Sequence, residues 1–79
     1  MGYHMGPIRK GTLGEFSKIT EEYDELKDAL TQSNTVLALC ELCDLIGAIE
    51  MYAKKFNVTL EELIRMKNAT KSSFESGER

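Results

Sequence analysis

The sequence predicts an all-α protein, with three helices in a single domain of 79 residues. In two long segments, apolar residues recur at steps of three and four, which is the period of a helix buried on one side. Ser, Thr or Asn, the residues that commonly cap helix N-termini, precede each helical segment. No strand pattern precedes the second segment, and the chain contains no internal repeat or low-complexity stretch.

Residues 1–11 are rich in glycine and contain the single proline, so we expect an extended N-terminal arm with a basic end at Arg9 and Lys10. The first helix is expected to begin at a capping box, Thr12-x-x-Glu15. Three acidic residues of this helix are expected to face solvent, namely Glu21, Asp24 and Asp28. The apolar stripe of the helix is Phe16, Ile19, Tyr23, Leu26 and Leu30.

A turn at residues 31–34 precedes the second helix, which is capped by Ser33 or Asn34 and runs from about residue 35 to about residue 56. Apolar residues cover more than half of its circumference: Leu39, Leu42, Leu45, Ile46, Ile49, Tyr52, Ala53 and Phe56. A helix this apolar is expected at the centre of an assembly larger than three helices. We therefore predict a dimer or a higher oligomer.

The third helix follows a short connection and a second capping box, Thr59-x-x-Glu62. Its apolar face begins with Leu60, Leu63, Ile64 and Met66. The segment then becomes polar, and Phe74 is the last expected anchor before a frayed end.

Charge and hydropathy exclude several classes of function. The net charge of −3 gives no general affinity for nucleic acid or for an anionic membrane. Glu41, Asp44 and Glu50 interrupt the apolar run at residues 36–53, which is therefore not a membrane span. The N-terminal residues lack the apolar core of a secretory signal, so a cytoplasmic location is expected.

Cys40 and Cys43 form a lone C-x-x-C within the second helix. A structural zinc site needs about four ligands, and the single histidine, His4, is expected to be solvated in the arm. Redox C-x-x-C motifs usually follow a strand. We expect two reduced thiols that act as small core residues.

The strongest functional signal is two pairs of acidic residues with the same spacing. They are Glu22 with Glu25, and Glu41 with Asp44. Residues three apart lie on one face of a helix, so two packed helices can bring four carboxylates together. Clustered oxygen ligands suit Mg²⁺, with Mn²⁺ as an alternative ion. The competing interpretation is a solvated charged surface. Two features favour metal: the pairs flank apolar stripes, and Asp44 lies in an apolar helix where an unpaired charge is costly.

Mg²⁺ in proteins is often completed by substrate phosphates, so this cluster suggests hydrolysis of a phosphoanhydride. Positive charge is then needed for the phosphate tail. The candidate substrate-binding residues are Lys18, Lys54, Lys67, Asn68 and Lys71.

The two acidic pairs also resemble the E-x-x-E and E-x-x-D motifs of the MazG-like all-α nucleoside triphosphate pyrophosphohydrolases. They occur here as Glu22-Tyr-Asp-Glu25 and Glu41-Leu-Cys-Asp44. The surrounding runs are similar too, including Leu60-Glu-Glu-Leu63 and Lys67-Asn68-x-x-Lys71. The resemblance covers about residues 8–79 and is closest to short, phage-type members.

This resemblance implies hydrolysis of a (deoxy)nucleoside triphosphate to the monophosphate and pyrophosphate. It implies Mg²⁺ bound by all four acids. It also implies subunits that assemble as dimers or tetramers, with an oligomeric core like a four-helix bundle and with sites near the subunit interfaces. Asn68 and Lys71 match positions that contact substrate in relatives. The chain is shorter than most members of the family and lacks the additional helix that many carry.

Two other classes of protein are the alternatives to this hydrolase. The first is a non-enzymatic helical module that has kept the fold and binds a nucleotide or a protein partner without turnover. A carboxylate-bridged di-iron protein needs E-x-x-H pairs, and this chain has none. No motif indicates which base or sugar is selected.

Overall fold

The computed structural model describes residues 4–78 and is helical throughout its regular regions. The elements are α1 (Phe16–Thr31), α2 (Thr35–Ala53), the single 3₁₀ turn η1 (Lys54–Phe56), α3 (Leu60–Ala69) and α4 (Lys71–Ser76). No strand occurs within this range. The prediction of an all-α fold is confirmed. The prediction of three helices is wrong, because the described residues form four α-helices: the predicted third helix breaks at Thr70 into α3 and α4.

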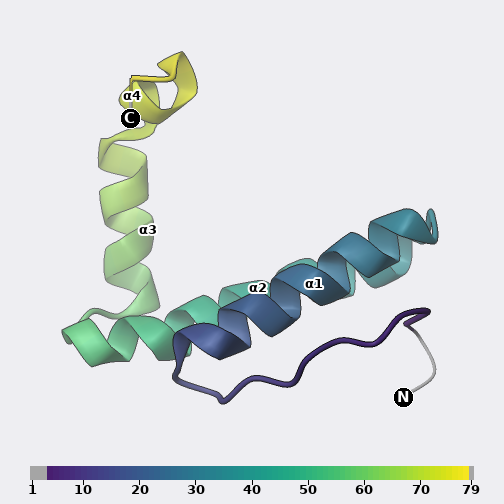
Figure 1. The fold of residues 1–79 in the computed structure, drawn as a ribbon. Helices are drawn as coiled ribbons and strands as arrows, with labels where there is room; N and C mark the ends of the chain where they lie inside the picture. Colours follow the sequence, from purple (N-terminus) through teal and green to yellow (C-terminus); the bar gives the residue numbers. More distant parts are fainter. Residues whose placement is uncertain (1–3, 79) are drawn as a thin grey trace.

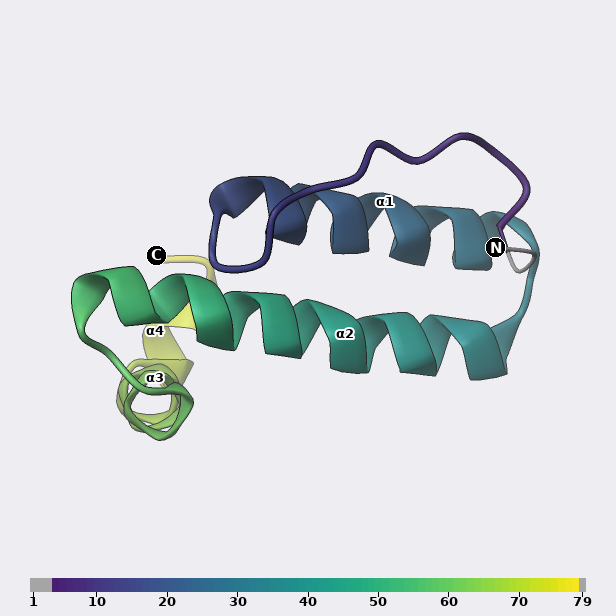
Figure 2. The same cartoon turned by 90° about the horizontal axis from the view of Figure 1, so that it is seen from below.

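Helices α1 and α2 form an antiparallel hairpin and lie side by side along most of their length (Figures 1 and 2). The short turn between them has Ser33 in the left-handed region, with φ of 56°. Asn34 then caps α2, because its Oδ1 accepts a hydrogen bond of 3.0 Å from the Leu37 N–H. Of the two predicted caps, the structure therefore selects Asn34.

The second helix is shorter than predicted and ends at Ala53. The backbone tightens into η1, and Asn57 adopts a left-handed conformation with φ of 58°, which stops the helix. The predicted capping box at Thr59 is confirmed. Thr59 Oγ1 accepts from the Glu62 N–H at 3.1 Å, and Glu62 Oε1 accepts from the Thr59 N–H at 2.8 Å.

Helix α3 projects away from the hairpin, and α4 follows it after a break at Thr70 (Figure 1). Phe74, the expected anchor of this end, is 65% exposed. The expectation that Phe74 packs into the core is wrong for a single chain, because α3 and α4 extend beyond the hairpin that would receive it.

The N-terminal arm, residues 4–11, runs back along α1 (Figure 2). The Gly11 N–H donates to Glu21 Oε1 at 2.8 Å, and the Met5 N–H donates to Asp28 Oδ2 at 3.0 Å. Glu21 is consequently only 3% exposed. The prediction that Glu21 and Asp28 face solvent is wrong, because the arm covers that side of the helix.

The start of α1 also differs from the prediction. Thr12 and Glu15 form a turn, in which the Glu15 N–H donates to the Thr12 carbonyl at 2.9 Å, and no side chain caps the helix. The Glu15 carboxylate instead accepts a hydrogen bond of 2.8 Å from Lys55 Nζ. The predicted capping box is therefore absent, since its acidic member is paired with a distant lysine.

The interior of one chain is small. Among residues 4–78, the buried apolar side chains are Ala29, Ala38, Ala48 and Ala53. Phe16, Tyr23 and Leu30, which were expected to be buried, are 52–62% exposed. Cys40 and Cys43 are free and exposed, so they are not core residues of a single chain. None of the helices in the described range is both long and apolar enough to cross a bilayer.

Candidate metal centre

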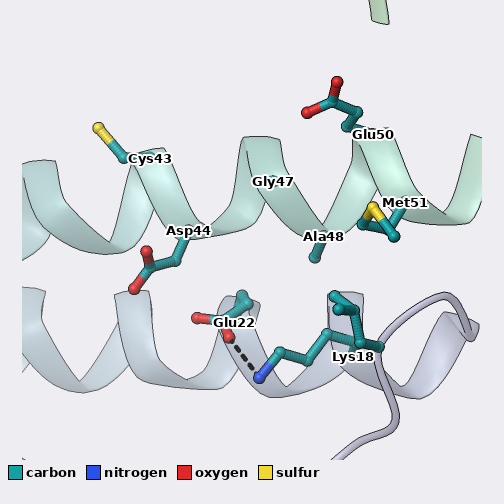
Figure 3. A pocket seen from close by; sticks show the side chains of 9 residues that line it. Lys18, Glu22, Cys43, Asp44, Gly47, Ala48, Glu50 and Met51 are labelled. Atoms are coloured by element: carbon teal, nitrogen blue, oxygen red, sulfur yellow. Dashed lines mark ion pairs between the residues drawn. The ribbon is translucent and has the colours of Figure 1, made fainter. Parts of the chain in front are cut away.

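The hairpin brings the two acidic pairs together. Glu22 and Glu25 come from α1, Glu41 and Asp44 come from α2, and one carboxylate oxygen from each lies within 4.8 Å of the others. Figure 3 shows Glu22 and Asp44 extending toward each other from the two helices. We call these four residues the acidic cluster. It arises because each pair occupies one helix face and the two faces meet in an antiparallel packing.

Two members of the acidic cluster are almost fully buried between the helices. Glu22 is 4% exposed and Glu41 is 5% exposed. The Oε1 atom of each is buried and accepts no hydrogen bond from residues 4–78. A buried carboxylate oxygen without a partner is costly. Four clustered carboxylates are the oxygen donors that hard divalent cations bind, so the donor set fits Mg²⁺ or Mn²⁺.

The same surroundings shift the protonation of the cluster. Burial, opposed by Lys18 and assisted by the neighbouring Glu25, raises the pKa of Glu22. Burial, together with the nearby Glu41 carboxylate, raises the pKa of Glu25. Both carboxyl groups therefore hold their protons more strongly than an ordinary glutamate does, as expected where like charges share one site.

Lys18 is the predicted substrate-binding residue that lies beside the acidic cluster. Its Nζ forms an ion pair with Glu22 Oε2 at 3.0 Å, drawn in Figure 3, and also lies 3.1 Å from Glu21 Oε1. The hydrogen bond to Glu22 is the largest cause of a raised pKa at Lys18. Together with Glu22, Asp44 and Gly47, Lys18 lines an open groove of about 470 Å³.

The other predicted substrate-binding residues lie elsewhere in the chain. Lys54 is in η1, Asn68 is in α3 and Lys71 begins α4. None of these three lines the groove beside the acidic cluster. Lys67 Nζ donates to Asn68 Oδ1 at 3.0 Å, while Lys71 Nζ is 4.0 Å from the exposed Glu75 carboxylate. A single chain therefore supplies Lys18 to the cluster but not Lys54, Asn68 or Lys71.

His4 is the residue at this site that the sequence did not indicate. Its Nε2 is 3.0 Å from Glu41 Oε2 and 3.9 Å from Glu25 Oε1, and its Nδ1 is 2.8 Å from Asp28 Oδ2. The side chain is 17% exposed, so the expected solvated histidine is wrong. Its partners lie 24 and 37 residues away, a separation that no local spacing pattern can detect.

Comparison of this chain with protein-family models, curated proteins and solved structures finds no match in any of the three. The MazG-like resemblance therefore stays a prediction that rests on the motifs described above.

Proposed function

We propose that this protein is a Mg²⁺-dependent nucleoside triphosphate pyrophosphohydrolase, converting a (deoxy)nucleoside triphosphate and water to the monophosphate and pyrophosphate. The observation that supports this most is the acidic cluster, in which four carboxylates from two helices converge and two buried oxygens have no donor among residues 4–78. Catalytic sites are places where burial and like charges are arranged to shift pKa values.

In this proposal Glu22, Glu25, Glu41 and Asp44 hold the ion. When bound, the ion would neutralise phosphate charge and lower the pKa of an attacking water molecule. The water oxygen bonds to the α-phosphorus, and pyrophosphate leaves with the electron pair of the broken phosphoanhydride bond. Glu25 is our candidate for the residue that orients the attacking water and takes its proton, since its carboxylate lies among those of Glu22, Glu41 and Asp44.

Lys18 is our candidate for the first phosphate contact. It lines the groove next to Glu22 and its side chain is 26% exposed, so the ammonium group can be reached from solvent. A substrate phosphate would compete with Glu21 and Glu22 for the same cation. Lysine is well suited to phosphate as a compact point charge on a flexible stem.

We also propose that the active form is a homo-oligomer. Apolar side chains of α2 and α3 line a hollow of about 650 Å³, which includes Ile46, Ile49, Leu63 and Ile64. A second copy would bury this surface, and a small core of alanines gives a strong physical reason for association. In this proposal Asn68 and Lys71 of one subunit act at the groove of another, as the MazG-like resemblance implies for sites near subunit interfaces.

The direct test incubates the full chain with a panel of canonical and modified triphosphates and Mg²⁺, and measures pyrophosphate release. Activity on at least one triphosphate is expected. Absence of pyrophosphate from every member of the panel would contradict the proposed reaction.

The sharper test uses Glu41→Gln combined with Asp44→Asn. Loss of two carboxylates should abolish turnover while the far-ultraviolet circular dichroism spectrum stays helical. Glu61→Gln, an exposed acid in the first turn of α3, is the matched control and should keep activity. Full activity in the double variant would show that the acidic cluster is not the metal site.

A non-enzymatic module is the second candidate, and one observation favours it. Lys18 and His4 already neutralise part of the cluster by pairing with Glu22 and Glu41. Calorimetry and the pyrophosphate assay together separate the enzyme from such a module. A protein-interaction module should show no Mg²⁺-dependent nucleotide binding, and a nucleotide-binding module should bind the nucleotide without releasing pyrophosphate.

A further inference from the structure

A second set of potential ligand atoms overlaps the acidic cluster. His4, Glu25 and Glu41 each offer one atom, and these three atoms lie within 4.8 Å of one another. The set differs from the acidic cluster in its chemistry, because one ligand atom is an imidazole nitrogen. It also joins three parts of the chain, the arm, α1 and α2.

Asp28 fixes the orientation of the His4 ring. Its Oδ2 accepts from His4 Nδ1 at 2.8 Å, from the Met5 N–H at 3.0 Å and from Gln32 Nε2 at 2.8 Å. With Nδ1 held in this way, Nε2 is directed at Glu41 and Glu25. Histidines that bind metal almost always donate their other ring N–H to a carboxylate or carbonyl, which fixes the tautomer and increases the basicity of the ligand nitrogen.

Glu41 provides an independent indication of a missing ligand. The residue is 5% exposed, and its Oε1 is buried without a hydrogen-bond donor from the described chain. Its Oε2 is the atom that meets His4 at 3.0 Å. The Glu41 carboxylate, which lies close to that of Glu25, thus has one oxygen in contact with a ring nitrogen. Its other oxygen has no hydrogen-bond donor among residues 4–78.

We propose that His4, Glu25 and Glu41 form a mixed nitrogen–oxygen site that binds a first-row transition-metal ion in preference to Mg²⁺. Imidazole suits transition metals, whereas Mg²⁺ prefers oxygen ligands, so the arm histidine changes which ion is selected. Three protein ligands leave further positions open to water or substrate oxygen. This inference rests on the proposed function, because the site shares Glu25 and Glu41 with the acidic cluster.

The test compares Co²⁺ and Mg²⁺ binding to the full-length wild type and to His4→Ala. Co²⁺ is followed by visible absorption and by proton NMR, in which a ligating imidazole gives a strongly shifted N–H signal that exchanges in heavy water. Mg²⁺ is followed by calorimetry. Wild type should show one such signal. His4→Ala should lose it and bind Co²⁺ about tenfold more weakly or worse, with Mg²⁺ affinity changed less than about twofold.

Two further variants sharpen the result. Asp28→Asn should keep the fold but weaken Co²⁺ binding by about tenfold, because an orienting partner is removed and not a ligand. Cys40→Ser with Cys43→Ser should leave the Co²⁺ spectrum unchanged, which excludes binding by the exposed thiols.

The outcomes also separate this inference from the proposed function. If Co²⁺ binds without a shifted imidazole signal, or binds His4→Ala as tightly as wild type or more tightly, His4 is not a ligand and the inference fails alone. If wild type binds neither ion, both the mixed site and the acidic metal centre are wrong. If the signal is present but no triphosphate is hydrolysed, the site stands and the proposed reaction fails.

Discussion

At the scale of single residues, one lysine forms ion pairs with two buried carboxylates. Lys18 Nζ contacts both Glu21 and Glu22, at 3.1 Å and 3.0 Å, and these acids are 3% and 4% exposed. Although burial acts to raise the pKa of Glu21, the Gly11 N–H and Lys18 hold that pKa below its usual value. At Glu22, burial and the neighbouring Glu25 outweigh the opposing effect of Lys18, and the pKa is raised.

Lys18→Met should destabilise the metal-free protein by roughly 1–3 kcal/mol, because two nearly buried carboxylates lose a charged partner that is itself partly exposed. Urea unfolding followed by circular dichroism measures the change. The matched control is Lys55→Met, whose pair with Glu15 is about half exposed on both sides and should contribute less than about 1 kcal/mol. Equal effects in the two variants would contradict the role given to burial.

The raised pKa values of Glu22 and Glu25 predict how pH and Mg²⁺ act together. A carboxyl whose folded pKa exceeds its unfolded value contributes stability below that unfolded value, near 4.5, and loses it as pH rises through the folded pKa. Bound Mg²⁺ replaces the lost protons and relieves the repulsion. The Mg²⁺-induced increase in Tm should therefore be larger at about pH 7.5 than at about pH 5.

Thermal unfolding at matched ionic strength, with and without Mg²⁺, checks this prediction. Glu22→Gln should reduce the increase in Tm at the higher pH. An increase in Tm that is the same at both pH values would show that these carboxylates do not hold the ion.

At the scale of elements, the arm and the α1–α2 hairpin depend on each other. The arm contributes His4 to the site and the Gly11 N–H to Glu21, and its last residues approach the first turn of α1 closely. A Cβ added at Gly11 would collide with the backbone carbonyl of Ser17. Glycine is required at position 11 because the arm backbone and the α1 backbone approach so closely that there is no room for a Cβ atom.

Gly11→Ala should cost roughly 1–3 kcal/mol, because the arm must shift and the hydrogen bond to Glu21 is strained. Gly47→Ala is the matched control, since a Cβ there meets no atom within 4 Å. Within helix α2 that alanine should stabilise the protein by about 0.5–1 kcal/mol. Opposite signs in urea unfolding are expected, and a neutral Gly11→Ala would show that the arm is not docked.

At the scale of the whole molecule, a single chain leaves many large apolar side chains of residues 4–78 exposed. Val36, Leu39 and Ile46 on α2 are 73%, 57% and 51% exposed, and Ile64 and Met66 on α3 are 44% and 60% exposed. Small domains that cannot build a sufficient core commonly associate. The exposed faces of α2 and α3 are the surfaces that we propose a second copy covers.

Ile64→Glu should disrupt this assembly, because a charge would be buried in the apolar hollow between α2 and α3. Sedimentation equilibrium should show an oligomer for wild type and mostly monomer for the variant, with a Tm that no longer depends on protein concentration. Ser72→Glu, at an exposed polar position of α4, is the control and should stay oligomeric. A monomeric wild type would contradict the proposed assembly.

Local patterns were sufficient for the all-α class and for the composition of the acidic cluster, but they did not predict the break at Thr70 between α3 and α4. Periodicity, Asn34 and the Thr59 capping box predicted the α2 and α3 starts, because caps and i, i+3 relations depend on neighbouring residues. The same patterns failed at Thr12, where a longer-range ion pair between Glu15 and Lys55 replaces the cap. They also failed for Phe16, Tyr23 and Leu30, since alanines set the hairpin contact.

By itself, the sequence determined that the chain is helical and that each of two helices carries two acids on one face, because the helical repeat relates residues one turn apart. The tertiary structure alone decided that these faces meet, that Glu21 is covered by the arm and that His4 reaches Glu41. Those contacts join residues 10 to 37 positions apart. They depend on how the arm and the two helices pack, which no local spacing specifies.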